Sequence, residues 1–463
     1  MLSANLPEDL MTEIMARLPV KSLLRFKCVA KSWHALITDP SFINKHLEQS
    51  YTISKNRCFK LMFQSNPYTP PSISMLSNRE EPRLVQDFEL PFSEKDLNLR
   101  WISVCGQCDG IFSLRLYLYR SSRSNDDEQR RLILWNPATK EVKVVPASQH
   151  QSKIKGAFDA VFGFGFDPIT KDYKIVGFPN RPQEEQEQSA AVEVYNLSMN
   201  SWRTIDVVAP SFEFFSSSYM NRSYLNGAHH WLANDDYNID KLIVSFEYSK
   251  EVFGIIELPP EANLSRFSNV LSIVDGSLAI FANYFSYALN EHHVEIWVMN
   301  EYGIESSWTK KFKIGSLTAI ENILGFWGDN EILVECAGKL ILYNPWNQQG
   351  RKFQIHFGTT MSLMMMVDYV ESLLPLGARK EPEHPSDSRI GFGFDPITKD
   401  YKVVRLLNWP WEEEEDEDEE EEEILVEVHN LSTNSWRTMG VDIPNYVLSC
   451  PSWSSCLNGF ITG

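Results

Sequence analysis

The segments LILWNPATKEVKVVP (132–146) and VEVYNLSMNSWRTI (192–205) carry the pattern that decides the fold, in which two short apolar strands are joined by a polar turn. Runs rich in β-branched and aromatic residues favour strands, and Asn, Pro and Ser between two such runs favour a hairpin. The same pattern returns at 244–259, 294–314 and 340–355. Most of the chain is therefore expected to be β-structure.

A short turn sequence is the second repeated feature of this region. Asp109-Gly110, Asn226-Gly227 and Asp275-Gly276 each stand before an apolar run, and Gly328-Asp329-Asn330 does the same. Asn-Gly and Asp-Gly favour tight hairpin turns because both residues tolerate positive φ. Each repeat thus contains about four strands in roughly 50 residues, which is typical of a β-propeller of the kelch kind.

The repeats predict a propeller of about six blades. Five blades are expected between 102 and 357, and residues 57–92 are expected to supply a sixth and help to close the ring. A closed ring leaves no long unpaired sheet edge. Its tryptophans, at strands and turn ends, are expected to pack between blades.

The C-terminal region repeats part of the propeller. Residues 391–401 (GFGFDPITKDY) are identical to 163–173, at an offset that is not a blade period. We therefore expect 391–463 to be a partial duplication of the segment 163–230, joined to the propeller by a linker at 378–390. The uninterrupted acidic run 412–423 is expected to form a solvated loop, because adjacent like charges cannot sit in a sheet.

The first fifty residues have a different pattern and predict three small helices. Apolar residues recur every fourth position along the first helix: Leu6, Leu10, Ile14 and Leu18. Pro7 can begin this helix and Pro19 must end it. A second helix is expected after Val20 and a third from Pro40. A module of about fifty residues seldom buries enough surface to be stable alone. We therefore expect one face of its helices to be covered either by a partner or by the rest of the same chain.

The string LPEDLMTEIMARLPVKSLLRFKCVAKSWHALITDPSFINKHL (6–47) resembles an F-box over its whole length. That resemblance implies docking onto a Skp-type adaptor, which links to a cullin and a RING subunit in an SCF ubiquitin ligase. It implies that the following residues make or support the contact: Leu6, Pro7, Leu10, Ile14, Leu18, Pro19, Leu23, Leu24, Val29 and Trp33.

The remainder resembles the plant F-box-associated, kelch-type domain, through GFGFDPITKDYKIV (163–176) and the hairpins quoted above. The ending MVDYVESLLPL (366–376) is similar to that of the S-locus F-box group, whose self-incompatibility members recognise a pollen-tube-inhibiting ribonuclease. The resemblance implies an F-box at 1–50, a propeller at 53–377 and an unknown protein substrate. The loop residues that bind it cannot be named from the sequence.

Charge and composition exclude several classes of function. The chain has 43 Lys and Arg against 62 Asp and Glu, and the net charge of -19 becomes -7 when the twelve acids of the run 412–423 are set aside. A nucleic-acid surface is therefore not expected. No apolar stretch approaches the roughly 20 residues that span a bilayer, and the N-terminus lacks a signal-peptide pattern. We expect no membrane contact and a location in the cytosol or nucleus.

Catalysis, cofactors and metals are not expected either. The chain has no Walker loop, no GxSxG and no HExxH. Cys105 and Cys108 form a lone CxxC, and the adjacent pairs His229-His230 and His292-His293 point to opposite faces of a strand. Two alternatives to a ligase receptor stay open: a protein-binding propeller scaffold, and a non-functional product of partial duplication.

Overall fold

The structure is a computed structural model, and its chain divides after Ala378 into two units that are described separately. It describes residues 8–57, 59–66, 69–77, 83–88, 99–118, 129–148, 160–179, 191–210, 212–214, 222–234, 241–259, 262, 269–286, 291–314, 320–328, 331–336, 339–353, 363–377, 389–395, 400–407, 425–430 and 435–439. Within these ranges no helix is both long and apolar enough to cross a membrane.

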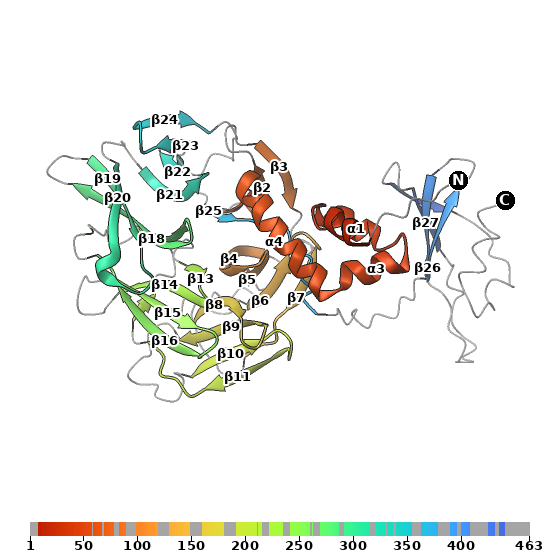
Figure 1. Ribbon diagram of the computed structural model, residues 1–463, viewed down its shortest axis with the longest axis horizontal. Helices are drawn as coiled ribbons and strands as arrows, with labels where there is room; N and C mark the ends of the chain where they lie inside the picture. The colour runs from red at the N-terminus through yellow and green to blue at the C-terminus, as the bar shows by residue number, and fades with distance from the viewer. Residues whose placement is uncertain are drawn as a thin grey trace, which may run out of the picture. The chain divides into compact units, whose positions relative to one another are not determined.

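The N-terminal module has four helices (Figure 1). They are α1 (Glu8–Met15), α2 (Val20–Phe26), α3 (Lys31–Thr38) and α4 (Pro40–Arg57). The prediction of three helices is wrong because the extended backbone of Ala30, with φ -151° and ψ 147°, separates α2 from α3. α4 also continues through the boundary expected near residue 50.

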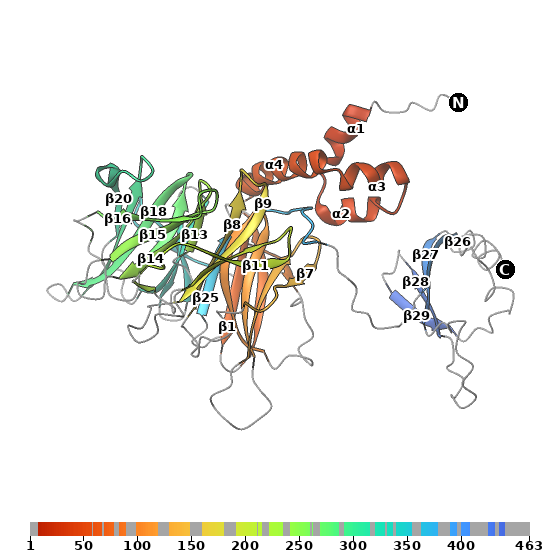
Figure 2. The same ribbon diagram turned by 90° about the horizontal axis from the view of Figure 1, so that it is seen from below.

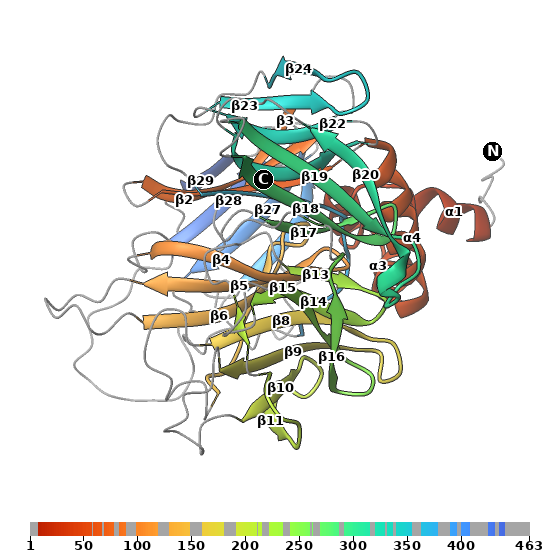
Figure 3. The same ribbon diagram turned by 90° about the vertical axis from the view of Figure 1, so that its left-hand side faces the viewer.

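A six-bladed β-propeller follows, as predicted, and each blade is an antiparallel sheet (Figure 3). The first blade combines β25 (Leu363–Asp368) with β1 (Lys60–Asn66), β2 (Thr69–Ser77) and β3 (Arg83–Phe88). The second has β4 (Leu99–Cys108), β5 (Ile111–Leu118), β6 (Gln129–Asn136) and β7 (Glu141–Val144). The third has β8 (Ala160–Asp167), β9 (Asp172–Pro179), β10 (Val192–Asn196) and β11 (Ser201–Ile205).

The other three blades follow in chain order. The fourth has β12 (Glu213–Phe214), β13 (Arg222–Leu225), β14 (Ala228–Asn234), β15 (Lys241–Glu247) and β16 (Val252–Glu257), with β12 and β13 both paired to β14. The fifth has β17 (Val270–Val274), β18 (Ser277–Ser286), β19 (Glu291–Met299), a 3-10 turn (Glu305–Ser307) and β20 (Trp308–Ile314). The sixth has β21 (Ile320–Trp327), β22 (Glu331–Cys336), β23 (Lys339–Asn344) and β24 (Gln349–Lys352).

The ring is closed by strands from opposite ends of the propeller sequence. β25 pairs antiparallel with β1, from Lys60 opposite Asp368 to Ser65 opposite Leu363. Residues 57–92 therefore supply three strands of the closing blade, and the fourth comes from β25. β1, the first strand of the propeller sequence, therefore has a paired strand on both sides.

Three of the four predicted turns lie where the sequence places them, and Asp329 and Asn330 of the fourth lie outside the described residues. Asp109, Asn226 and Asp275 have φ of 50°, 53° and 51°, and the glycine after each also has positive φ. These turns join β4 to β5, β13 to β14 and β17 to β18 in blades two, four and five. Because strands alternate in direction within a blade, the connections between third and fourth strands lie at the same end.

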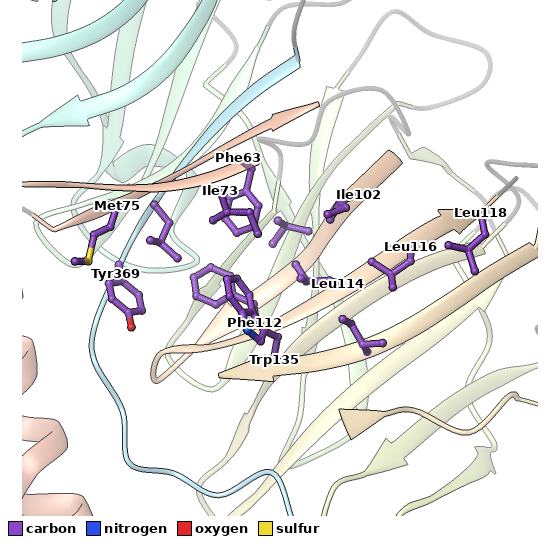
Figure 4. Close-up of a cluster of buried hydrophobic side chains, with 13 residues drawn as sticks. Phe63, Ile73, Met75, Ile102, Phe112, Leu114, Leu116, Leu118, Trp135 and Tyr369 are labelled. Carbon is purple, nitrogen blue, oxygen red and sulfur yellow. The ribbon is translucent and has the colours of Figure 1, made fainter. Parts of the chain in front are cut away.

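Large apolar side chains fill the space between blades, and Figure 4 shows one such cluster. Phe63, Ile73 and Met75 of the closing blade face Phe112 and Trp135 of the next blade. The Phe63 and Phe112 ring centroids are 5.6 Å apart. The expectation that the tryptophans pack between blades is confirmed for four that are buried: Trp135, Trp231, Trp297 and Trp308. Trp202, expected to do the same, is only partly buried.

His230 links the fourth blade to the fifth. Its Nδ1 lies 3.0 Å from Ser223 O and its Nε2 lies 2.8 Å from Tyr302 Oη. Burial lowers the pKa of His230 to about 4. The ring is therefore neutral at pH 7, with Nδ1–H donating to Ser223 O and Nε2 accepting from the Tyr302 hydroxyl.

This histidine predicts a pH-dependent stability. Its folded pKa lies below the unfolded value of ~6.5, so the unfolded chain binds the proton first as the pH falls and stability is lost from about pH 6.5 downward. Between pH 7.5 and 5.5 we expect the unfolding free energy to fall by about 1 kcal/mol through His230 alone. Denaturant titrations at the two pH values measure this fall, and it should be smaller by about 1 kcal/mol in His230→Asn than in wild type. The matched change at the exposed His34 should leave the slope as it is in wild type, and equal slopes for all three proteins would contradict the assignment.

The second unit contains one described sheet, β26 (Arg389–Asp395), β27 (Asp400–Leu407), β28 (Leu425–Asn430) and β29 (Ser435–Met439), paired in that order. Its register repeats that of the third blade: Phe394 lies opposite Tyr401 as Phe166 lies opposite Tyr173. The acidic run 412–423 and most of the expected linker lie outside the described residues.

Candidate functional site

The N-terminal module leaves apolar side chains exposed on α1. Leu10 and Ile14, one helical turn apart, are 48% and 45% exposed. Met15, on another side of the same helix, and Ala16, just after it, are each 1% exposed and belong to the module core. α1 therefore carries two apolar faces, of which one is covered by its own chain and the other is not.

The other predicted docking residues fall into two groups. Val29, just after α2, is 64% exposed, and Pro19 is exposed as well. Leu18, Leu24 and Trp33 are half-buried against the core, while Leu23 is fully buried in it. Leu6 and Pro7 lie outside the described residues. Among those described, the structure thus separates side chains that can meet a partner from those that support them.

The module is held in shape by polar contacts between its helices. At the start of α4 the Ser41 hydroxyl and Ser41 N both donate to Asp39 Oδ1, and the hydroxyl bond is the main cause that lowers the pKa of Asp39. His46 of α4 lies with its Nε2 3.0 Å from Leu18 O, just after α1, and burial lowers the pKa of His46. Lys45 of α4 also forms an ion pair with Glu13 of α1. The contacts of His46 and Lys45 fix α1 against α4, so the exposed residues of α1 are presented on a rigid surface.

The surface around Val29 is basic. Residues 20–38 contain four cations and no carboxylate. The cations are Lys21, Arg25, Lys27 and Lys31, which are exposed or half-buried. An apolar contact ringed by positive charge suits a partner whose matching surface is acidic.

Sequence reasoning missed one residue that the module depends on. α2 begins after Pro19, whose side chain has no acceptor for the free N–H groups of a helix start. The carboxylate of Glu371, 351 positions away, accepts a hydrogen bond from Val20 N at 3.0 Å. The absence of a local cap was visible in the sequence, but the position of the residue that replaces it was not.

The module also touches the propeller. Tyr51 Oη of α4 donates a hydrogen bond of 2.7 Å to Asp109 Oδ1 in the β4–β5 turn. Figure 2 shows α4 at this end of the blades, where the short turns lie. The helices therefore occupy the short-turn end of the propeller.

Comparisons with known families agree with this division. Residues 4–45 match the F-box domain, and residues 61–376 and 330–461 match the F-box associated beta propeller domain. The F-box/kelch-repeat protein At3g23880 of Arabidopsis thaliana is 28% identical over 349 residues, which cover 74% of this chain and 88% of the relative. The F-box protein CPR1 of the same plant is 27% identical over 332 residues, or 67% and 73% of the two chains.

Proposed function

The chain belongs to the F-box associated beta propeller domain family, with an F-box domain before the propeller, and from this premise we propose that it is the substrate-recognition subunit of an SCF ubiquitin ligase. The F-box would bind a Skp-type adaptor and, through it, a cullin and a RING subunit. The propeller would bind the protein to be modified. The chain itself would perform no chemistry, because ubiquitin is transferred by the other subunits.

The observation that carries this proposal is the set of apolar residues left exposed by a rigid helical module. Leu10, Ile14 and Val29 are exposed although the module has its own buried core. A small domain gains nothing from exposing large apolar side chains unless a partner covers them. These three, with Pro19 and the half-buried Leu18, Leu24 and Trp33, are the residues we propose for the adaptor contact, and Leu23 supports them from the core.

We propose the opposite end of the propeller as the substrate side. The helical module occupies the end where β4 meets β5 in a two-residue turn. At the other end the sequence between strands is longer, for example from Leu118 to Gln129 and from Pro179 to Val192. Loops on a rigid scaffold can vary without unfolding it, which suits them to substrate selection.

Co-purification tests the proposal. The full chain, mixed with a plant Skp-type adaptor, a cullin and a RING subunit, should elute from gel filtration as one complex containing all four proteins. Ubiquitin transfer to the chain's own lysines should require every subunit. A folded chain that elutes apart from the adaptor at micromolar concentration would contradict the proposal and favour a propeller scaffold outside the ligase.

The finer assignment to the S-locus F-box group is also a proposal, supported by the similarity of residues 366–376 to the ending of that group. It makes a pollen-tube-inhibiting ribonuclease the first substrate to try. A location in the cytosol or nucleus, expected from the sequence pattern, stays part of the proposal. A ribonuclease of that class should bind the chain with its adaptor attached. Failure of every such ribonuclease to bind would remove the group assignment and leave the ligase proposal intact.

We propose further that residues 378–463 are a partial duplication that forms no ring of its own. A blade of the propeller is covered on both faces by its neighbours, as β8–β11 is by the clusters on either side. The duplication supplies no neighbouring blades that could cover the two faces of its copied sheet. Limited proteolysis should therefore remove this region at least tenfold faster than it cuts the propeller. Equal survival of both fragments on a gel would show a stable second unit.

A further inference from the structure

Residues 369–376, here called the strap, follow β25 and run between the F-box and the propeller. The strap forms no helix or strand, yet Tyr369, Ser372, Leu373 and Leu376 are each at most 4% exposed. Irregular segments normally lie on the surface because their backbone groups need partners. The strap therefore has specific contacts on both sides.

On the F-box side, the strap reaches the start of α2 and the core of the module. Glu371 Oε2 accepts the hydrogen bond from Val20 N, and a carboxylate at a helix N-terminus is favourable. Leu373 belongs to the same buried cluster as Leu23 and Phe42. Removal of the strap would open the core of the F-box.

α4 is joined to the strap as well. The Ser54 hydroxyl donates a hydrogen bond to the carbonyl of Tyr369. Tyr369 N in turn donates to Phe59 O at 3.0 Å, just beyond the end of α4. The strap thus holds both the first turn of α2 and the last turns of α4.

On the propeller side, the strap is bound by the second blade. Asn136 Nδ2 donates to Ser372 O and to Leu374 O, both at 3.0 Å. Leu376 N donates to Glu141 Oε2 at 2.9 Å. Asn136 ends β6 and Glu141 begins β7, on either side of the turn that joins these strands, so the strap is fixed to the end of the propeller that faces the F-box.

Gly110 marks how closely the strap approaches the propeller. A Cβ at this position would lie 2.3 Å from Val370 O and 2.9 Å from Ser372 Cβ. Gly276 has the same kind of turn, with φ +78° against +79°, but nothing lies within 4 Å of its Cβ position. The two glycines share the turn strain and differ in the strap contact.

We propose that the strap is a positioning device that holds the F-box in one orientation relative to the propeller. The role of the strap in this inference rests on the proposed function, because a receptor must hold its substrate at a set distance and direction from the adaptor. A flexible joint would lower the effective concentration of the substrate at the site of transfer. Glu371 and Leu373 are the positioning residues on the F-box side, and Gly110 leaves room for the strap on the propeller side.

Two matched pairs of variants test the strap in the full chain. Gly110→Ala displaces the strap, and Gly276→Ala introduces the same turn strain without touching it. Glu371→Ala removes the acceptor for Val20 N, while Glu371→Gln keeps an acceptor oxygen. The second pair decides the question if Gly110→Ala fails to fold.

The readouts are the distribution of distances between fluorophores placed at the exposed Lys31 and Lys250, and hydrogen exchange at the start of α2. Wild type, Gly276→Ala and Glu371→Gln should give one narrow distance distribution. Glu371→Ala and Gly110→Ala should broaden it and speed exchange at Val20 at least tenfold, while exchange in the fifth blade stays unchanged. Narrow distributions and equal exchange in all variants would overturn the proposal. Both readouts use the isolated chain, so a failure to bind the adaptor counts against the proposed function alone.

Discussion

Replacing Leu10, Ile14 and Val29 together by alanine is expected to weaken binding of the chain to a Skp-type adaptor at least 100-fold. Truncation of an apolar side chain at the centre of an interface typically costs ~1 to 3 kcal/mol, and three such losses, ~3 to 9 kcal/mol together, exceed the ~2.7 kcal/mol that a 100-fold change requires. All three side chains are exposed in the chain by itself. The unfolding free energy should therefore change by less than about 1 kcal/mol.

Calorimetric titration with the adaptor measures this effect, and the chain offers a matched control. Val144, Val208 and Ile255 are each more exposed than Leu10 and Ile14 but lie on the propeller, and their triple alanine variant should bind as wild type does. Leu23→Ala should act differently: Leu23 is fully buried, so its truncation should cost ~2 to 5 kcal/mol of stability. Unchanged binding by the docking variant would place the adaptor contact elsewhere.

The difference between Leu10 and Leu23 shows what the sequence could predict of this site. The resemblance named both residues, but the four-residue spacing of Leu10 and Ile14 does not tell whether their stripe faces the core or a partner. The neighbouring Met11, Met15 and Ala16 offer a second apolar face, and only the packing of α1 decides which face is covered. The break between α2 and α3 was missed for a related reason, since FKCVAK contains neither Gly nor Pro to mark it.

Local chemistry made the propeller easier to predict. Asp-Gly and Asn-Gly favour tight turns because both residues adopt positive φ. Each such turn defines a hairpin, and the spacing of the hairpins defines the repeat. The closing strand was not predicted as such, because Leu363–Asp368 is a short apolar run with no turn signal and its partner Lys60–Asn66 lies about 300 residues earlier. Pairing at that distance depends on the completed ring.

That closing strand carries the last prediction. A chain that ends at residue 358 should fail to fold, whereas a chain that ends at 377 should melt as cooperatively as the full-length protein. The shorter chain loses β25, which pairs with β1, and it also loses the strap. It also loses several large buried side chains, among them Tyr369, Val370, Leu373 and Leu376.

Each of these side chains contributes ~1.5 to 3 kcal/mol when buried, so the combined loss of about 10 kcal/mol approaches the whole stability of a typical domain. The exposed edge of β1 would also invite aggregation. Thermal melting followed by circular dichroism, with gel filtration, should show no cooperative transition for 1–358 and one for 1–377. The 1–377 chain is the control, because it lacks the whole second unit and keeps both β25 and the strap. A cooperative melt of 1–358 near the temperature of 1–377 would mean that five blades and three strands suffice, and that the ring does not depend on its closing strand.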